Sequence, residues 1–329
     1  MCYDKDMFQR LKTLYYSLFL RRREQYFKPV VLVTGCGSGI GWALAKLLYK
    51  ETRYRVIATA RTKSIEKLKR EMPETDRFWI RELDITIEAN RDHLLQEIRQ
   101  KWGGVNILIN NAGISYRSVI EHMTEKDELA QMTTNYLGPM GLIRGVLPFM
   151  RSRGRGKIIS VSSVSGMLAM PTMGSYTASK HALEGAHEAL WYEAKPFGIS
   201  VSLIQPGFIK SNSFRNVYYT EKSTPEMNVK GPYHDYYAHM DPFIEHMMNR
   251  SISNPKRIAK LVLKVVRREN PPLWIPATLD AWVFSYLRRF LPRRLLLPLL
   301  FMFLPGAKHW ARGYSKKRRH LRRTSAPVR

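Results

Sequence analysis

The sequence predicts an α/β protein built on one doubly wound parallel β-sheet, and three observations indicate this class. From Pro29 onward, short runs rich in Val and Ile alternate with longer segments whose apolar residues recur at helical spacing, as in parallel strands joined by helices. A glycine-rich turn follows the first apolar run, and such turns occur where a parallel sheet binds a ligand beyond its strand ends. The hydrophobic content of 44% is ordinary for a globular domain.

The alternation predicts each element in order. Strands are expected at residues 30–34, 55–60, 78–83, 105–110, 157–162, 200–204 and 273–275. Helices are expected near residues 40–51, 64–71, 87–101, 128–151, 176–195 and 255–269. Because parallel strands need right-handed helical crossovers, the ligand crevice should lie at the carboxyl ends of the strands.

The composition excludes several other classes. Two cysteines, Cys2 and Cys36, cannot form a disulfide scaffold or a zinc site on their own. The nine histidines show no H-E-x-x-H pattern, so no metal site is expected. The sequence has neither the G-x-S-x-G turn of serine hydrolases nor the phosphate loop of NTPases. Its apolar runs are shorter than the ~20 residues that cross a bilayer.

The net charge of +27 is concentrated at the two ends of the chain. Residues 1–28 form a basic amphipathic flank with seven Lys and Arg against three acids, and residues 281–329 carry thirteen and no acid. The expected folded domain, residues 29–280, has a net charge of +10. Arginines follow the N-terminal apolar stretch, which is wrong for a secretory signal peptide. Such flanks suit nucleic acid, an anionic membrane surface, or simply solubility.

The first expected strand runs into the glycine turn TGCGSGIG, residues 34–41. Glycines allow a tight turn, a close approach to phosphate groups and close packing of the next helix on the strand. The N–H groups and the positive dipole at the start of that helix suit a diphosphate. Gly35, Gly39 and Gly41 follow a G-x-x-x-G-x-G spacing.

Further motifs follow in order down the chain. They are Asn110-Asn111-Ala112-Gly113, Asn135, Ser163, Tyr176 with Lys180, and Pro206-Gly207. With the glycine spacing, they resemble the short-chain dehydrogenase/reductase family over about residues 29–275, and most closely its steroid and retinol dehydrogenase branch. The resemblance implies a Rossmann-type fold in a single domain and a nicotinamide cofactor. It also implies oxidoreductase activity on alcohols and carbonyl compounds.

The end of the second strand discriminates between the two nicotinamide cofactors. An acid there accepts the ribose 2′-hydroxyl, whereas a small residue followed by Arg accommodates a 2′-phosphate. The sequence reads Ala60-Arg61 with no acid within reach, so NADP(H) is expected in preference to NAD(H). By resemblance, Asp84 and Ile85 contact the adenine. The expected cofactor-binding residues are Gly35, Ser38, Gly39, Ile40, Gly41, Arg61, Asp84, Ile85, Asn111, Ala112, Gly113, Tyr176, Lys180, Pro206, Gly207, Ile209 and Ser211.

Tyr176 and Lys180 lie four residues apart and so share one face of an expected helix. A phenol of pKa near 10 is a poor acid or base at neutral pH, but a nearby ammonium favours its ionised form by about one to three units. Lys180 is therefore expected to tune Tyr176 as the general acid and base. By resemblance, Ser163 hydrogen-bonds the substrate oxygen, with Ser162 as the nearest alternative, and Asn135 supports a proton relay.

Residues 208–254 are rich in Phe, Tyr and Met, and in the family the equivalent segment covers the substrate. An apolar, adaptable lining suits a large lipophilic substrate, while an ordinary lid core is the alternative. The residues concerned are Phe208, Phe214, Tyr218, Tyr219, Met227, Tyr233, Tyr236, Tyr237, Met240, Phe243, Met247 and Met248.

Residues 281–305 alternate apolar clusters with Arg pairs, and a basic run follows at 316–323. This pattern indicates a segment that lies in a membrane interface without crossing it, near anionic lipid. We expect peripheral membrane association facing the cytoplasm. No nucleic acid partner is expected, because neither stacking aromatics nor a recognition fold accompanies the tail. Packing of residues 295–304 on the domain or on a second copy, as in a homodimer, is the alternative.

Two functions from different classes remain after the sequence alone. The preferred one is an NADP(H)-dependent oxidoreductase that interconverts a lipophilic alcohol and its ketone or aldehyde. The alternative is a non-catalytic module that senses NADP(H) at a membrane. The set Asn135, Ser163, Tyr176 and Lys180 argues against the alternative, because a sensor needs no proton relay.

Overall fold

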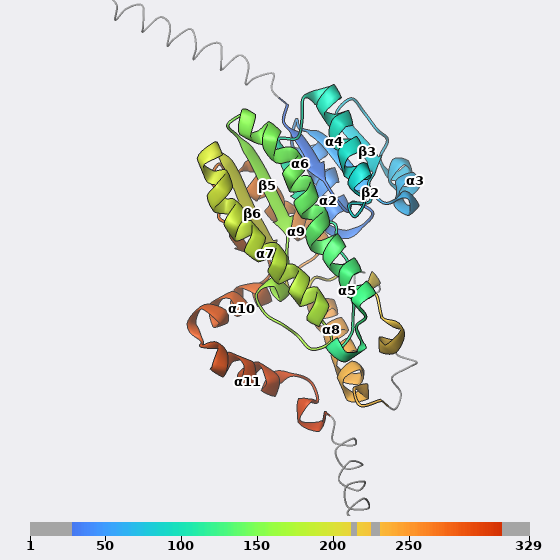
Figure 1. Ribbon diagram of the computed structural model, residues 1–329, viewed down its shortest axis with the longest axis vertical. Helices are drawn as coiled ribbons and strands as arrows, with labels where there is room; N and C mark the ends of the chain where they lie inside the picture. Colours follow the sequence, from blue (N-terminus) through green and yellow to red (C-terminus); the bar gives the residue numbers. More distant parts are fainter. Residues whose placement is uncertain (1–27, 212–215, 225–230, 311–329) are drawn as a thin grey trace, which may run out of the picture.

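Seven parallel strands form one sheet in the order β3-β2-β1-β4-β5-β6-β7 (Figure 1). This computed structural model describes residues 28–211, 216–224 and 231–310. The strands are β1 (Val30–Val33), β2 (Arg55–Ala60), β3 (Phe78–Glu82), β4 (Ile107–Asn110), β5 (Gly156–Val161), β6 (Ile199–Gln205) and β7 (Trp274–Pro276). The predicted doubly wound sheet is confirmed, with each strand within two residues of its expected bounds. Strand order reverses between β1 and β4, where such sheets bind ligands.

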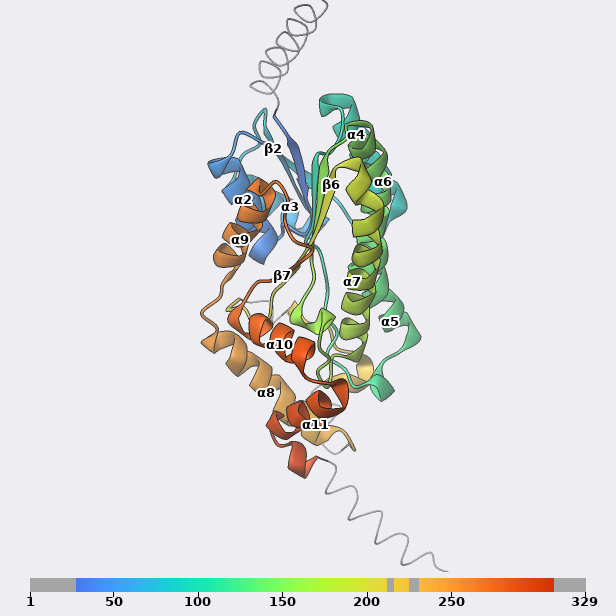
Figure 2. The same ribbon diagram turned by 90° about the vertical axis from the view of Figure 1, so that its left-hand side faces the viewer.

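Helices cover both faces of this sheet (Figure 2). One face carries α2 (Gly39–Glu51), α3 (Thr62–Glu71) and α9 (Pro255–Arg267), and the other carries α4 (Glu88–Trp102), α6 (Gly138–Ser152) and α7 (Gly174–Ala194). Both layers have their own apolar core against the strands. The strands are therefore buried on both sides, which explains their nearly continuous Val and Ile runs.

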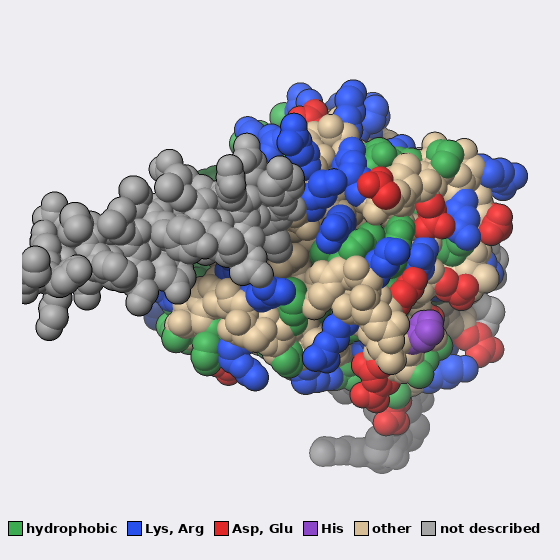
Figure 3. Space-filling model, turned by 90° about the horizontal axis from the view of Figure 1, so that it is seen from above, with side chains coloured by type: hydrophobic (Ala, Val, Ile, Leu, Met, Phe, Trp, Pro, Cys, Tyr) green, Lys and Arg blue, Asp and Glu red, His purple; other side chains and the backbone are tan. Residues whose placement is uncertain are grey.

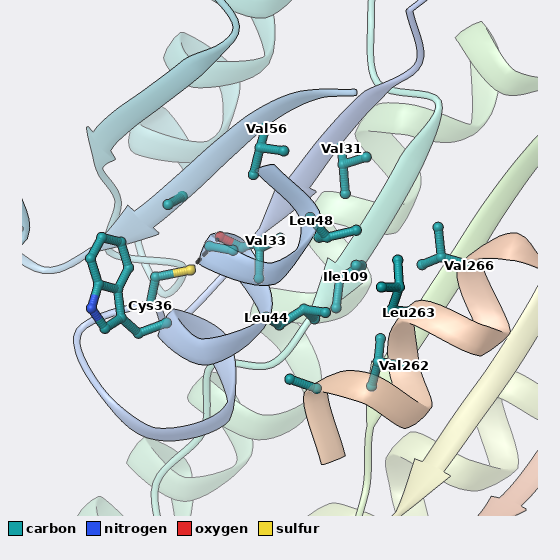
Figure 4. Packing of buried hydrophobic residues seen from close by; sticks show 14 of the residues in the cluster. Val31, Val33, Cys36, Leu44, Leu48, Val56, Ile109, Val262, Leu263 and Val266 are labelled. Atoms are coloured by element: carbon teal, nitrogen blue, oxygen red, sulfur yellow. Dashed lines mark hydrogen bonds between the residues drawn. The ribbon is translucent and has the colours of Figure 1, made fainter. Parts of the chain in front are cut away.

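Helix α9 begins at a residue that caps it, and its apolar face then packs in the core. Asn254 caps it by accepting a hydrogen bond from the N–H of Arg257 at 3.0 Å, and Pro255 occupies the first turn. Val262 and Val266 then recur on one face. They lie beside Leu44 of α2, so that both helices pack on β1 (Figure 4).

The long helix expected at residues 128–151 is divided in the structure. It consists of α5 (Glu125–Met132), a π-helical segment at Thr133–Leu137 and α6. The π segment contains Asn135, and a wide turn of this kind often marks a functional position. Hydrophobic spacing alone could not reveal it, since the segment is only five residues long and differs from an α-helix in having i→i+5 hydrogen bonds.

Three helices lie beyond the carboxyl ends of the strands and were not predicted. They are α8 (His234–Arg250), α10 (Leu279–Phe290) and α11 (Arg293–Phe303) (Figure 1). Pro242 and Pro298 lie inside α8 and α11, and an internal proline normally argues against a helix. The expected boundary between residues 280 and 281 falls within α10.

The two ends of the molecule differ in the side chains that they expose. Lys and Arg side chains gather on the end opposite α10 and α11, with acids toward one side (Figure 3). The end that carries α10 and α11 exposes large apolar side chains. Within the described part of the chain, none of the helices combines the length and the hydropathy that a membrane span requires.

Candidate active site

The glycine turn after β1 lies against the loop that follows β4. A Cβ on Gly35, whose φ is +70°, would lie 2.6 Å from Ala112 Cα. The amide nitrogen of the Asn111 side chain donates to the carbonyl oxygens of Thr34 and Gly35 at 2.9 and 3.0 Å. Asn111, expected to contact the cofactor, thus braces the turn that would hold it.

The start of α2 fits the diphosphate of a dinucleotide. Gly39 has a φ of +61°, and a Cβ there would meet nothing within 4 Å, so the turn is open on this side. Ser38 precedes the helix without capping it through its side chain. A Cβ on Gly41 would lie 2.5 Å from the carbonyl oxygen of Gly35. Position 41 must therefore be glycine for the helix to pack closely on the turn. The first N–H groups of α2 therefore lie beside open space at the strand ends.

The end of β2 differs from the sequence-based expectation. Ala60 is paired with Glu82 of β3, and the Glu82 carboxylate accepts a hydrogen bond from the Thr62 hydroxyl at 2.5 Å. An acid is therefore close to this position, contrary to the prediction that none was within reach. It was missed because sheet pairing, not sequence proximity, brings Glu82 beside Ala60. Arg61 is exposed at the start of α3.

Asp84 and Ile85 follow β3 at the same edge. One carboxylate oxygen of Asp84 accepts from the backbone N–H and the hydroxyl of Thr86, at 2.9 and 2.6 Å, which fixes the carboxylate. Ile85 is buried, and its carbonyl would lie 2.8 Å from a Cβ on Gly138. Contact of this pair with adenine stays a prediction.

A cavity of 370 Å³ brings most of the expected site together. It runs from the glycine turn, through the catalytic candidates, to α8. Its polar wall includes Ser38, Asn111, Ser163, Tyr176, Lys180 and Arg117, and its apolar wall includes Ile40, Met170, Met173, Pro206, Phe208, Ile209, Ile244 and Met248. Ser211, expected to contact the cofactor, is half-buried.

Tyr176 projects from the first turns of α7 and is hydrogen-bonded to the Ser163 side chain. Burial of its hydroxyl raises the pKa of Tyr176 above 10, against the opposing effects of the Ser163 hydrogen bond and the positive charge of Arg117. Lys180 was expected to lower the pKa of Tyr176, but in the protein without cofactor this pKa is raised. Burial dominates, and the cation that opposes it is Arg117.

Lys180 is buried behind the tyrosine. Its Nζ donates to the carbonyl oxygen of Val161 at 2.9 Å and lies 5.7 Å from the centre of the Tyr176 ring. Burial lowers the pKa of Lys180 to about 8, although the nearby Glu184 acts in the opposite direction. A buried lysine near its pKa can hold or release a proton at neutral pH.

The structure favours Ser163 over Ser162 as the partner of the tyrosine. The Ser162 hydroxyl donates to Glu184 at 2.6 Å, and Gln205 also donates to this carboxylate at 2.9 and 3.0 Å. Ser162 thus serves a buried network, in which burial raises the pKa of Glu184 despite these hydrogen bonds. Ser163 accepts from the N–H of Ser165 at 3.1 Å and reaches Tyr176.

Asn135 lies in the π segment and is 1% exposed. Its carbonyl oxygen accepts from the N–H of Ile114, and its amide donates to the Ile114 carbonyl, both at 2.9 Å. The amide also donates to the Ser179 hydroxyl at 3.0 Å. Asn135 therefore ties the loop after β4 to α7, and a role in the proton relay stays a prediction.

The aromatic and Met residues of 208–254 belong to the cavity, to a small core, or to both. Phe208 and Met248 line the cavity and also pack against this core. Met240 instead packs with Trp310, and Phe243 packs against the same small core. The alternative of a lid core thus holds for part of this set, while Phe214 and Met227 lie outside the described residues.

Sequence reasoning missed two charged residues at this site. Asp280, at the start of α10, accepts from the N–H of Phe208 at 2.8 Å, and a Cβ on Gly207 would collide with it. Arg117 lies in the cavity wall at 3% exposure. Neither belongs to a spaced motif. Arg117 had only one signal, its position four residues after Gly113.

Comparison with known proteins identifies the family. The model of the short chain dehydrogenases matches residues 29–222. The chain is 32% identical to the 3-ketodihydrosphingosine reductase of Bacteroides thetaiotaomicron over 250 residues, which covers 74% of this chain and 85% of that protein.

Two solved structures share the fold. A gluconate 5-dehydrogenase from Burkholderia cenocepacia, in complex with NADP and tartrate, is 28% identical, with a TM-score of 0.53 over 57% of this chain and 74% of that one. A short chain dehydrogenase/reductase from Burkholderia phymatum, in complex with NAD, is 20% identical, with a TM-score of 0.66 over 80% and 94%. The chain described here belongs to the short-chain dehydrogenase/reductase family of oxidoreductases.

Proposed function

We propose that this protein interconverts a lipophilic alcohol and its ketone or aldehyde, with NADP(H) as the preferred cofactor. The observation that carries the proposal is the single cavity lined by Ser163, Tyr176 and Lys180, at the end of the sheet that also bears the open glycine turn. A non-catalytic sensor would need the glycine turn alone.

The proposed chemistry assigns one task to each side chain. The nicotinamide, when bound, would accept or donate the hydride. Tyr176 would give its hydroxyl proton to the developing alkoxide in reduction and take it back in oxidation. Ser163, already hydrogen-bonded to that hydroxyl, would hold the substrate oxygen beside it. Lys180, with its lowered pKa, would supply positive charge behind the phenol.

The cavity supports a substrate with a large apolar part. Met170, Met173, Phe208, Ile244 and Met248 line the end opposite the glycine turn, and methionines adapt to flexible chains. A relative named 3-ketodihydrosphingosine reductase makes a long-chain keto-lipid a reasonable first choice. Steroids and retinoids are the other members of the test panel.

The decisive experiment assays this panel with NADPH and NADH, using wild type, Tyr176→Phe and Tyr192→Phe. Tyr192 lies on the same helix but is exposed, so it controls for the substitution itself. We expect Tyr176→Phe to lower kcat at least a hundredfold, as for loss of a general acid, and Tyr192→Phe to have no effect. Equal turnover in all three proteins would refute the catalytic assignment.

Cofactor preference depends on Arg61 and Glu82. Arg61 would meet a 2′-phosphate, whereas the carboxylate of Glu82 lies near the same position, bonded to Thr62. Arg61→Ala should weaken NADPH binding at least tenfold more than NADH binding, since one charge-assisted contact contributes about 1.5–3 kcal/mol. Glu82→Gln should favour NADPH further. Equal effects of Arg61→Ala on both cofactors would contradict the NADP preference.

We further propose that α10 and α11 rest on an anionic membrane surface. Their exposed apolar side chains are Leu279, Trp282, Val283, Tyr286, Phe290, Leu295, Leu297, Phe301, Met302 and Phe303, with Arg288, Arg289, Arg293 and Arg294 between them. Apolar side chains flanked by arginines are typical of an interfacial segment.

Only part of the apolar surface of α10 and α11 packs against the rest of the domain. Leu296 is buried, and Leu304 packs near Trp310, so the segment is anchored to the domain. Flotation with vesicles of phosphatidylcholine and phosphatidylserine should be lost for Phe290→Ser/Leu297→Ser/Phe303→Ser. The control Ile120→Ser/Leu129→Ser alters exposed apolar residues elsewhere. Unchanged flotation of the first variant would refute this surface.

A further inference from the structure

Arg117 is a buried cation in the cavity wall and is attached to the segment that covers the cavity. Its guanidinium lies 3.4 Å from the carboxylate of Asp241, in the middle of α8. The other oxygen of that carboxylate accepts from the Tyr219 hydroxyl at 3.1 Å. Asp241 therefore joins the cavity wall to two parts of the covering segment.

The backbone around Arg117 makes the same connection. Its N–H donates to the carbonyl of Tyr218, and the N–H of Tyr218 donates to Ser115, both at 2.8 Å. Two residues further on, the N–H of Val119 donates to the Tyr237 hydroxyl of α8 at 3.0 Å. The loop at 115–119 thus holds both residues 216–224 and α8.

The charge of Arg117 also acts on Tyr176. Both residues line the same cavity, and the charge lowers the pKa of the tyrosine against the effect of burial. The groups that face Tyr176 are Ser163, Lys180 and Arg117. The groups that face Arg117 are Asp241, Tyr219 and Tyr176, and Tyr237 faces Asp241.

We propose that Arg117 is a positioning residue that couples the docking of α8 on the cavity wall to proton transfer at Tyr176. When α8 is docked, Asp241 holds the guanidinium in the cavity wall, where it favours the ionised phenol. The kinetic part of this inference, the effect on Tyr176, rests on the proposed function. The structural part, the attachment of α8 to the cavity wall, rests on the ion pair with Asp241.

Loss of either partner of the ion pair predicts a kinetic effect in the same direction. Alcohol oxidation needs the ionised tyrosine, so its rate should rise with pH through the pKa of Tyr176. Arg117→Met removes the cation and should move this rise about one unit to higher pH, about a tenfold loss of rate on the rising limb. Asp241→Asn keeps a hydrogen-bond acceptor but removes the charge that holds Arg117 in the wall, and should move the rise to higher pH by a smaller amount.

Arg81→Met is the matched control. Arg81 forms a half-buried ion pair with Glu97 at 2.9 Å, far from the cavity wall, so its loss should leave the pH profile unchanged. A shift to lower pH for Asp241→Asn would overturn the proposal, because Asp241 would then only offset the charge of Arg117 and not position it. A rise in KM alone, with no shift for Arg117→Met, would also overturn it and would make Arg117 a substrate-binding residue.

Hydrogen exchange tests the structural half without any substrate. Amides of α8 should exchange about tenfold faster in Arg117→Met than in wild type or Arg81→Met, because the helix loses its attachment to the wall. Unchanged exchange of α8 would overturn the coupling. If the wild type oxidises no alcohol but this exchange increases, the proposed function fails while the attachment by Arg117 stands.

Discussion

Replacing Gly35 with alanine perturbs the contact between the glycine turn and the loop after β4. Gly35 has a φ of +70°, and an added Cβ would lie 2.6 and 2.8 Å from the Cα and N of Ala112. These are backbone atoms, so no side chain can rotate away. Gly39→Ala is the matched control, because Gly39 has a similar φ of +61° but open space around an added Cβ.

The expected costs differ because only one variant separates the two loops. In Gly39→Ala the left-handed backbone conformation alone costs about 1–2 kcal/mol. In Gly35→Ala the loops must also move apart. This strains the hydrogen bonds from Asn111 Nδ2 to the Gly35 carbonyl and from Ala112 N to Thr34 Oγ1, at 3.0 and 3.1 Å. At about 1 kcal/mol for each bond, we expect a loss of about 3 kcal/mol or more.

Urea unfolding without cofactor measures these costs, and cofactor titration by fluorescence quenching measures binding separately. The expected order is wild type, then Gly39→Ala, then Gly35→Ala, with equal slopes against urea. Equal unfolding free energies for the two variants would show that the loops are not held as the hydrogen bonds indicate. That result would refute the argument from close approach, whatever happens to cofactor binding.

Three further substitutions test buried groups in and behind the site. Burial lowers the pKa of His187 to about 4, whereas the unfolded chain keeps about 6.5. As pH falls through this window the unfolded state takes up the proton first, and about 3 kcal/mol of stability is lost. Urea unfolding at pH 7 and pH 4.5 measures this loss of stability, which should be smaller in His187→Gln than in wild type. An equal loss in the two proteins would contradict the assignment to His187. Ser162→Ala should lower the free energy of unfolding by about 1–3 kcal/mol, because Glu184 loses a hydrogen-bond donor, and should change kcat little. Ser163→Ala should instead lower kcat. The reverse pattern would exchange the roles of the two serines.

The parts of the fold that sequence predicts well are those set by local pattern. The strands are short, apolar and bounded by turns, so each of the seven could be placed within two residues. The glycine turn is predicted because positive φ values and close contacts admit few residues other than glycine, as Gly35 illustrates. Two of the helices beyond the sheet, α8 and α11, escaped prediction because Pro242 and Pro298 interrupt their pattern while tertiary packing still holds them.

The contacts between distant parts of the chain could not be predicted in the same way. Glu82 lies beside Ala60 only because β2 and β3 pair in that register. Asp280 reaches Phe208 across 72 residues, and Arg117 reaches Asp241 across 124. The three acids concerned, Glu82, Asp280 and Asp241, each place a negative charge near a motif that can be recognised in the sequence. Motifs therefore locate the chemistry here, while long-range pairing sets its electrostatics.

The pKa of Tyr176 shows why that distinction matters for mechanism. Spacing places Lys180 on the same face of α7 and predicts a lowered pKa, yet spacing says nothing about burial. In the structure Lys180 donates to the Val161 carbonyl and has a lowered pKa of its own, about 8, so part of its charge is lost near neutral pH. Burial raises the pKa of Tyr176, and Arg117 opposes that rise. An arginine keeps its charge at every pH at which the protein is folded. It is therefore the more dependable source of positive potential for this phenol, and its strength depends on where Asp241 of α8 holds it.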